Sequence, residues 1–193
     1  MKKVYVCCAV LLVCAVGAAF GQSNTDLAQA AFDRGVAATN QENYDLAMRE
    51  YTEAIRLNPN FWQSYLMRGA SYADKKDWDA AISDCTQAIQ LNADNSIAYY
   101  LRGCAYYEKD DFDSAIADLT QAIRFDPNAV NAYYYRGYSY LQHGAANRSS
   151  SDIDSADADA DALAWLEPDS SRGANLKAFV DGYKKVSWYR ATP

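Results

Sequence analysis

Small residues return along the chain at a fixed spacing of 34 residues, between stretches of mixed apolar and polar positions. The pair Arg-Gly recurs at 34–35, 68–69, 102–103 and 136–137. An alanine stands twelve residues after each of the first three glycines, and a second alanine follows seven residues later. A period of this length is typical of a supersecondary unit that is stacked several times. The pattern therefore predicts an array of repeats.

Each unit is expected to form two antiparallel helices. The second helix opens at Asn43, Asp77 or Asp111, residue types that cap helix N-termini, and an aromatic residue and an aspartate follow each of them. Small residues let the two helices approach closely, and tyrosines in repeated registers fill the layers between them. No unit can cover its own apolar face, so neighbouring units must stack into a solenoid. The repeated structural positions are Gly35, Gly69, Gly103 and Gly137 on the first helices, Ala47, Ala81 and Ala115 on the second helices, and Pro59 and Pro127 at the ends of the first and third units.

The register of these residues resembles the tetratricopeptide repeat (TPR) family over roughly residues 28–169. The resemblance implies an all-α fold, a right-handed α-solenoid of antiparallel helix pairs. The regular units then span residues 28–61, 62–95 and 96–129, and a degenerate fourth unit spans residues 130–170.

The fourth unit differs from the others by an insertion. Residues 152–156 repeat the opening of the third unit's second helix almost letter for letter, but seven additional residues precede them. Glycine, asparagine and serine in the inserted stretch predict a flexible loop near residues 144–151. Apolar residues at helical spacing then predict a C-terminal capping helix over residues 171–187, followed by a tail at 188–193.

The N-terminus has the layout of a secretory signal peptide. Two lysines precede a stretch from Val4 to Phe20 that carries no charge, and small residues stand at the expected cleavage site. We therefore expect residues 1–21 to be a signal peptide of bacterial type and residues 22–27 to be a short linker. The mature protein is then exported, to the periplasm or as a secreted protein.

Two alternatives for this N-terminal segment stay open. The apolar stretch is close to the length that spans a membrane, so one alternative is an uncleaved anchor. The other is lipidation at Cys14, although Val13 stands where the bacterial lipoprotein motif has a small residue. Cleavage leaves only Cys85 and Cys104, which do not make a disulfide framework. Cys85 is expected to be an inert buried thiol, and a reactive role for Cys104 is a weaker hypothesis.

The formal net charge of −7 argues against a nucleic-acid partner, because such proteins need clustered lysines and arginines to displace counterions. The repeated arginines are expected to form ion pairs with acids on the second helices: Arg34 with Glu50, Arg68 with Asp84, Arg102 with Asp118, and Arg136 with Asp159. An arginine ladder for an anionic ligand is the alternative. A basic face on the last helix, formed by Lys177, Lys184, Lys185 and Arg190, leaves peripheral membrane association as a further alternative.

The sequence predicts no catalytic, metal or cofactor site. His143 is the single histidine, and neither a nucleophile–histidine set nor a phosphate-binding glycine loop accompanies it. The run of aspartates from Asp152 to Asp161 is similar to a calcium loop, but the turn glycine and the closing glutamate of such a loop have no counterpart. We therefore expect no enzyme activity and no cofactor, with calcium binding as the weaker alternative.

In TPR arrays the inner face of the first helices lines a concave groove that holds an extended peptide or a partner helix. The resemblance places on this face Phe32, Val36, Gln63, Leu66, Ile97, Tyr100, Cys104, Tyr107, Asn131, Tyr134, Tyr138 and Leu141. Members that bind chaperone tails clamp a terminal carboxylate with Lys and Asn, but Phe32 and Val36 stand where that pair begins. The groove is therefore expected to be apolar and to become richer in tyrosine toward its C-terminal end.

The leading hypothesis for function is a scaffold or adaptor that binds a protein or peptide through an apolar segment lying in this groove. A hypothesis from another class is a small-molecule or ion-binding accessory subunit of a cell-envelope transporter, with the tyrosine-rich groove as its pocket. A competing structural interpretation is that the C-terminal helix folds back and fills the groove itself.

Overall fold

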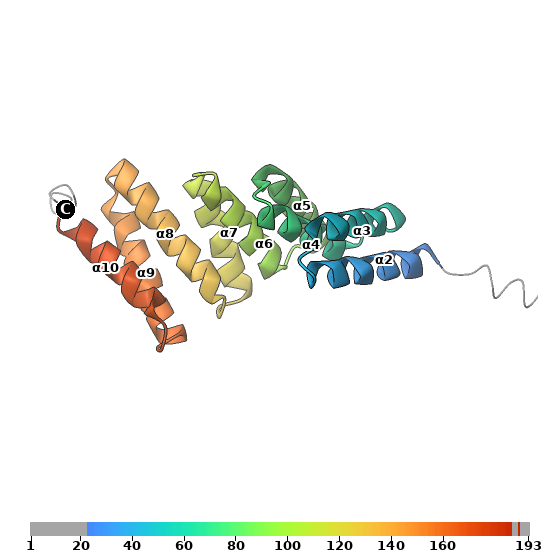
Figure 1. Cartoon of the computed structure of the whole chain (residues 1–193). Helices are drawn as coiled ribbons and strands as arrows, with labels where there is room; N and C mark the ends of the chain where they lie inside the picture. Colours follow the sequence, from blue (N-terminus) through green and yellow to red (C-terminus); the bar gives the residue numbers. More distant parts are fainter. Residues whose placement is uncertain (1–22, 187–188, 190–193) are drawn as a thin grey trace, which may run out of the picture.

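The computed structural model describes residues 23–186 and residue 189 of the chain. Within these residues every regular element is an α-helix, and the helices follow one another in chain order along an elongated stack (Figure 1). They are α2 (Asn24–Thr39), α3 (Tyr44–Leu57), α4 (Trp62–Asp74), α5 (Trp78–Leu91), α6 (Ser96–Glu108), α7 (Phe112–Phe125), α8 (Val130–Asn147), α9 (Ser150–Leu166) and α10 (Ser171–Lys184). The expected signal peptide and nearly all of the expected tail lie outside the described residues.

The helices from α2 to α9 pack as four pairs joined by short turns: α2 with α3, α4 with α5, α6 with α7, and α8 with α9. The second helix of each pair also contacts the first helix of the next, and successive first helices touch one another. This pattern is that of stacked layers, so the expected α-solenoid of helix pairs is confirmed. No helix within residues 23–186 is long and apolar enough to cross a membrane.

The second helices begin where the sequence indicates. Asn43, Asp77 and Asp111 each accept a hydrogen bond of 3.2 Å from the backbone N–H three residues further on. Each cap satisfies one of the free N–H groups in the first turn of its helix. The glycines of the first helices lie opposite these helices, and a Cβ at Gly103 would stand 2.8 Å from Leu119 Cγ. Glycine is therefore required there by close helix packing.

The first helix starts earlier than the sequence suggests. Ser23 and Asp26 form a capping box, in which the Ser23 hydroxyl accepts from the Asp26 N–H and the Asp26 carboxylate accepts from the Ser23 N–H, both at 3.1 Å. The helix α2 accordingly begins at Asn24. The expectation of a linker through residue 27 is therefore wrong, because this reciprocal cap nucleates the helix inside it.

The repeated arginines tie adjacent units together. Arg102 donates from Nε and Nη2 to the two carboxylate oxygens of Asp118, at 2.6 and 2.8 Å, and from Nη1 to the Thr86 hydroxyl of the preceding unit at 3.0 Å. The same contacts recur at Arg68 with Asp84 and Thr52, and at Arg136 with Asp159 and Thr120. The expected ion pairs are confirmed, including Arg34 with Glu50. Since these guanidiniums are already engaged, they are structural groups and not a ladder for an anionic ligand.

The fourth unit holds its insertion in longer helices. The helix α8 has 18 residues and α9 has 17, against 13 in α6 and 14 in α7. The expectation of a flexible loop near residues 144–151 is therefore wrong. Ser149 caps α9, and Gly144 allows a close approach at which an added Cβ would lie 3.0 Å from Asp152 Cβ. Packing between the two helices thus decides the conformation of a stretch whose composition is typical of a loop.

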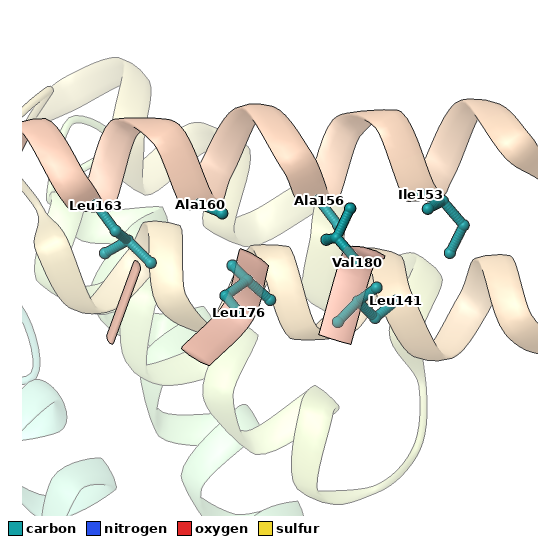
Figure 2. Close-up of a cluster of buried hydrophobic side chains, with 7 residues drawn as sticks. All are labelled: Leu141, Ile153, Ala156, Ala160, Leu163, Leu176 and Val180. Atoms are coloured by element: carbon teal, nitrogen blue, oxygen red, sulfur yellow. The ribbon is translucent and has the colours of Figure 1, made fainter. Parts of the chain in front are cut away.

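The last helix continues the stack beyond the fourth pair. Leu176 and Val180 of α10 are fully buried in the largest hydrophobic cluster of the described residues. The cluster consists of Leu141, Ile153, Ala156, Ala160, Leu163, Leu176 and Val180, and Figure 2 shows them converging from α8, α9 and α10. Gly173 brings α10 so close to α9 that an added Cβ would stand 2.8 Å from the Ala164 backbone nitrogen. The helix α10 therefore occupies the place that a first helix of another unit would take.

Candidate functional site

A row of partly exposed aromatic rings crosses the inner side of the C-terminal half of the stack. We call it the aromatic face, and it comprises Tyr100 and Tyr107 of α6, Tyr134, Tyr135 and Tyr138 of α8, and Phe179 of α10. Consecutive rings touch, with centroid separations of 5.5 Å for Tyr107–Tyr135, 4.8 Å for Tyr134–Tyr138 and 5.9 Å for Tyr138–Phe179. These distances are those of tilted and edge-to-face aromatic pairs. The rings thus form one connected surface across three helices.

Helical spacing explains why these side chains share a face. Tyr134 and Tyr138 are four residues apart on α8, so they lie one turn above the other. Tyr100 and Tyr107 are two turns apart on α6, with Cys104 between them. Because the first helices stack side by side, the same register on each helix adds to the same surface.

Two neighbouring pockets open on this surface. The tyrosine pocket has a volume of about 280 Å³ and is lined by Tyr100, Asn131, Tyr134, Tyr135, Arg172 and Asn175. The rim pocket has a volume of about 400 Å³ and lies where the helices α6, α8 and α10 begin. Its lining includes Ile97, Tyr100, Asp126, Val130, Asn131, Glu167 and Arg172. The pockets adjoin, since they share Tyr100, Asn131 and Arg172.

Arg172 stands between the two pockets and is held there by three groups. Its Nη1 donates to Asn131 Oδ1 at 2.8 Å and lies 3.8 Å from Glu167 Oε2. Its guanidinium carbon lies 5.8 Å from the centroid of the Tyr134 ring, a cation–π distance. The one arginine on this part of the described surface is therefore hydrogen-bonded to an amide, and a carboxylate compensates part of its charge. The site lacks the free cations with which a carboxylate clamp would bind an anion.

Burial sets the chemistry of the groups along the aromatic face. It raises the pKa of the Tyr100, Tyr107 and Tyr138 hydroxyls above the ordinary value, so these groups stay protonated and can donate hydrogen bonds. Burial likewise raises the pKa of the Cys104 and Cys85 thiols to about 12. A thiol with such a pKa is not a nucleophile near neutral pH. The arrangement favours non-covalent binding and not thiol chemistry.

The structure brings together most of the residues expected in the C-terminal half of the groove. Ile97, Tyr100, Cys104, Tyr107, Asn131, Tyr134 and Tyr138 lie on or beside the aromatic face. Ile97 is 57 % exposed, which is unusual for an isoleucine and leaves it available to a partner. This end of the chain is accordingly the candidate site.

The remaining residues that were expected in the groove are placed differently. Leu66 is only 7 % exposed and packs against Ala88 and Ala98, and Leu141 is 3 % exposed in the cluster under α10. Including them in a binding surface is therefore wrong, because neighbouring helices cover them. Phe32 and Val36 are partly exposed and pack against the buried cluster around Tyr51, just as the tyrosines of the aromatic face pack against the clusters beneath them. Neither of them lines a pocket of the candidate site, and Gln63 is half-buried on α4.

Four residues of the site were missed by the sequence argument. Tyr135 belongs to the ring network, and Arg172, Asn175 and Phe179 come from α10. The sequence does carry a signal for the last three residues. Arg172, Asn175 and Phe179 follow Asn131, Tyr134 and Tyr138, respectively, by 41 residues. The same spacing separates Pro127 from Pro168. Phe179 is 56 % exposed at the end of the row, so α10 extends the inner face and does not fill it.

The acidic stretch of α9 is divided among different partners. The carboxylate of Asp152 contacts His143 Nδ1 at 2.8 Å, and Asp157 contacts Lys177 and Lys184 at 2.6 and 2.7 Å. Within the described part of the chain no group of three His, Cys, Asp or Glu side chains is arranged to hold a metal ion. The same contacts neutralise two lysines of the basic face expected on α10.

A stack of helix pairs with an open inner face defines an α-solenoid of the repeat type. Two family profiles match the chain, one described as TPR repeat over residues 103–144 and one described as tetratricopeptide repeat over residues 32–96. The chain therefore belongs to the tetratricopeptide repeat family. Among curated proteins, the comparison finds no match to this chain.

Solved structures of the same fold are numerous. The Arabidopsis OM64 TPR domain is 28 % identical over 60 % of this chain and 96 % of that domain, with a TM-score of 0.59. The first TPR domain of Spaghetti (RPAP3), bound to the HSP90 peptide SRMEEVD, is 25 % identical over 60 % of this chain and 91 % of that domain, also with a TM-score of 0.59. A tetratricopeptide repeat protein from Parabacteroides merdae covers 85 % of this chain and 61 % of that protein, with a TM-score of 0.71. Its identity of 18 % shows a shared fold alone.

Proposed function

We propose that this protein is an interaction module that binds an apolar or aromatic segment of a partner polypeptide on the aromatic face. The observation that carries the proposal is the connected row of rings with two pockets beside it. Tyrosine supplies a large, rigid contact area together with a hydroxyl, at low cost in conformational entropy. Such surfaces recognise extended or helical segments through several side chains at once.

The comparison with Spaghetti (RPAP3) supports binding of a polypeptide but suggests a different ligand chemistry. That domain is bound to an acidic HSP90 peptide. The present site offers rings, amides and one arginine that Asn131 and Glu167 already engage. We infer that the partner segment of the present protein contributes apolar surface, in contrast to the acidic peptide SRMEEVD bound to that domain.

The double variant Tyr100→Ala and Tyr134→Ala tests the proposal. It removes two rings that line the tyrosine pocket and should weaken partner binding by at least about 2 kcal/mol, the cost typical of losing hot-spot side chains. The measurement compares polypeptides retained by the immobilised wild type and by the variant, from extracts of the organism that makes it. Circular dichroism should show unchanged helix content.

A matched control is Tyr44→Ala, a tyrosine of α3 outside the aromatic face. It should retain the same polypeptides as the wild type. If the double variant unfolds, the rings are core and the proposal fails. Unchanged retention by a folded double variant contradicts it equally.

A small-molecule accessory subunit is the second candidate. It is supported by the volume of the rim pocket, about 400 Å³, which falls within the roughly 300–1,000 Å³ of ligand sites, and by the adjoining tyrosine pocket of about 280 Å³. Native mass spectrometry distinguishes the two functions, since a bound small molecule without any polypeptide partner favours this candidate.

We also propose that the protein acts outside the cytoplasm. Support comes from the N-terminal sequence alone, where the uncharged stretch from Val4 to Phe20 precedes small residues at a cleavage site. The mass of the mature N-terminus tests this. A free or cyclised Gln22 is expected, whereas a retained Met1 points to an anchor and a lipidated Cys14 to a lipoprotein.

A further inference from the structure

Carboxylates flank the aromatic face at the end where its helices begin. Asp126, in the turn before α8, and Glu167, in the turn before α10, both line the rim pocket. Asp126 is exposed, and its Oδ1 accepts a hydrogen bond from the backbone N–H of Asn128, at 3.0 Å. Arg172 compensates part of the Glu167 charge from 3.8 Å. The rim pocket is therefore net acidic, and its lining also includes the apolar side chains of Ile97 and Val130.

A further carboxylate stands at the opposite end of the same row of rings. Glu108 is the last residue of α6 and is exposed. Burial, and after it the charge of Glu108, raises the pKa of the Tyr107 hydroxyl. The pKa of Tyr135 is raised by burial first, then by Cys104 and then by Glu108. Glu108 directly follows Tyr107 at the end of α6, so its charge lies near that ring. With Asp126 and Glu167 it forms what we call the acidic rim.

We propose that the partner segment is basic as well as apolar, and that its lysine or arginine side chains bind the acidic rim while its apolar residues lie on the aromatic face. This inference rests on the proposed function and specifies the partner's chemistry. A cationic side chain in the rim pocket would lay its aliphatic stem along Ile97 and Val130 and bring its charge to Asp126 and Glu167. Tyrosine rings add cation–π attraction to the same groups.

The net charge of the whole chain also favours a cationic partner segment. A formal net charge of −7 attracts a cationic segment from a distance and repels an acidic one. At the site itself, Asn131, Tyr134 and Glu167 already engage Arg172, so an acidic peptide would have to displace existing contacts. Charge complementarity thus distinguishes this surface from one that binds the SRMEEVD peptide.

Two labelled synthetic peptides of equal length test the inference. The first carries tryptophan and leucine flanked by lysines, and its twin has glutamate in place of every lysine. Fluorescence anisotropy with the folded protein should show that the lysine peptide binds at least about tenfold more tightly than its twin. The advantage should shrink as salt concentration rises, because exposed charges are screened.

Variants assign the effect to the acidic rim. Asp126→Asn with Glu167→Gln should weaken binding of the lysine peptide about tenfold. The control Asp45→Asn with Glu53→Gln removes the same charge from α3, which contacts only α2 and α4 among the described helices, and should leave the affinity unchanged. A loss of affinity in both double variants would mean that net charge alone is responsible, which overturns the inference.

The remaining outcomes separate the inference from the proposed function. If both peptides bind equally and Tyr100→Ala with Tyr134→Ala abolishes both, the aromatic face binds partners but the partner need not be basic. Tighter binding of the glutamate twin would make Arg172 an anion anchor and would also overturn the inference. If neither peptide binds measurably, the proposed function itself is contradicted.

Discussion

A contact among three side chains recurs at the scale of single residues and fixes each unit to its neighbours. In the third unit Arg102 is shared between Asp118 on its own second helix and Thr86 on the preceding one. Asp118 is buried, so its charge has left water and depends on the guanidinium for compensation. Contacts between units therefore explain the arginines at positions 68, 102 and 136, whereas Arg34 pairs with Glu50 of its own unit.

Replacing Asp118 by alanine should test this arrangement. The change leaves the Arg102 charge largely buried without its partner, and the free energy of unfolding should fall by about 3–5 kcal/mol. Urea denaturation measures the loss. Glu53→Ala breaks an exposed pair with Arg56 and should change stability little, so equal losses in both variants would contradict the account.

Sequence spacing predicts these residue contacts well, because the partners recur in the same register in each unit. Sequence spacing predicts the solvent exposure of side chains less well. Leu66 has the register of a groove residue, but Ala88 and Ala98 of neighbouring helices cover it. Burial of this kind depends on the distance between units, which no local pattern encodes. Tyr100 and Tyr134, at the same register in later units, stay accessible enough to line a pocket.

At the scale of the elements, α10 completes the site as well as the stack. It buries Leu176 and Val180 against α8 and α9, and it presents Arg172, Asn175 and Phe179 to the inner face. Loss of α10 from its place would therefore remove one wall of the tyrosine pocket. The aromatic face and the end of the array are stabilised by the same contacts.

Two glycines of α10 provide a matched test of this packing. Gly173→Ala would place a Cβ 2.8 Å from the backbone of Ala164 and should destabilise the protein by about 1–3 kcal/mol as α10 moves away from α9. Gly182→Ala meets no atom within 4 Å and should raise stability by about 0.5–1 kcal/mol through helix propensity. Thermal unfolding of the two variants measures the changes in stability. Equal changes would contradict the close contact between α10 and α9.

The ion pairs between α9 and α10 should make this contact dependent on pH. Burial alone would raise the pKa of Asp157, but hydrogen bonds from Lys177 and Lys184 outweigh it, and the pKa is lowered. The ionised carboxylate therefore stabilises the folded state above its unfolded pKa, and the contribution is lost as pH falls through the lowered folded-state value.

Asp157→Asn should therefore lower the free energy of unfolding by about 1–2 kcal/mol at neutral pH. The difference from the wild type should shrink as the pH falls below about 3.9, the ordinary pKa of an aspartate in an unfolded chain. Chemical denaturation across this range measures it. A difference that stays constant with pH would show that the lost interaction is not ionic.

The sequence predicts the elements themselves from period, caps and small residues, and these agree with the structure. It fails at the insertion, where glycine, asparagine and serine suggest a loop. Those residues extend α8 and α9 because Gly144 permits contact and Ser149 supplies a cap. Local composition could not show that a second helix lies close enough to stabilise the extension.

For the whole molecule, the two ends of the stack differ. The N-terminal units bury Phe32 and Leu66 to varying degrees, whereas α6, α8 and α10 together expose a ring-lined surface with pockets. The site therefore belongs to no single unit and exists only when three first helices are stacked. We expect a partner polypeptide to occupy this surface.

Site-specific photo-cross-linking tests that claim most directly. A benzophenone-bearing phenylalanine would replace Ile97, which lines the rim pocket and is 57 % exposed, or Trp165, which is 79 % exposed on α9 and lines neither pocket. Irradiation in the producing cells should give a polypeptide adduct from position 97 and none from position 165. Adducts from position 165 alone, or equally from both positions, would contradict binding on the aromatic face.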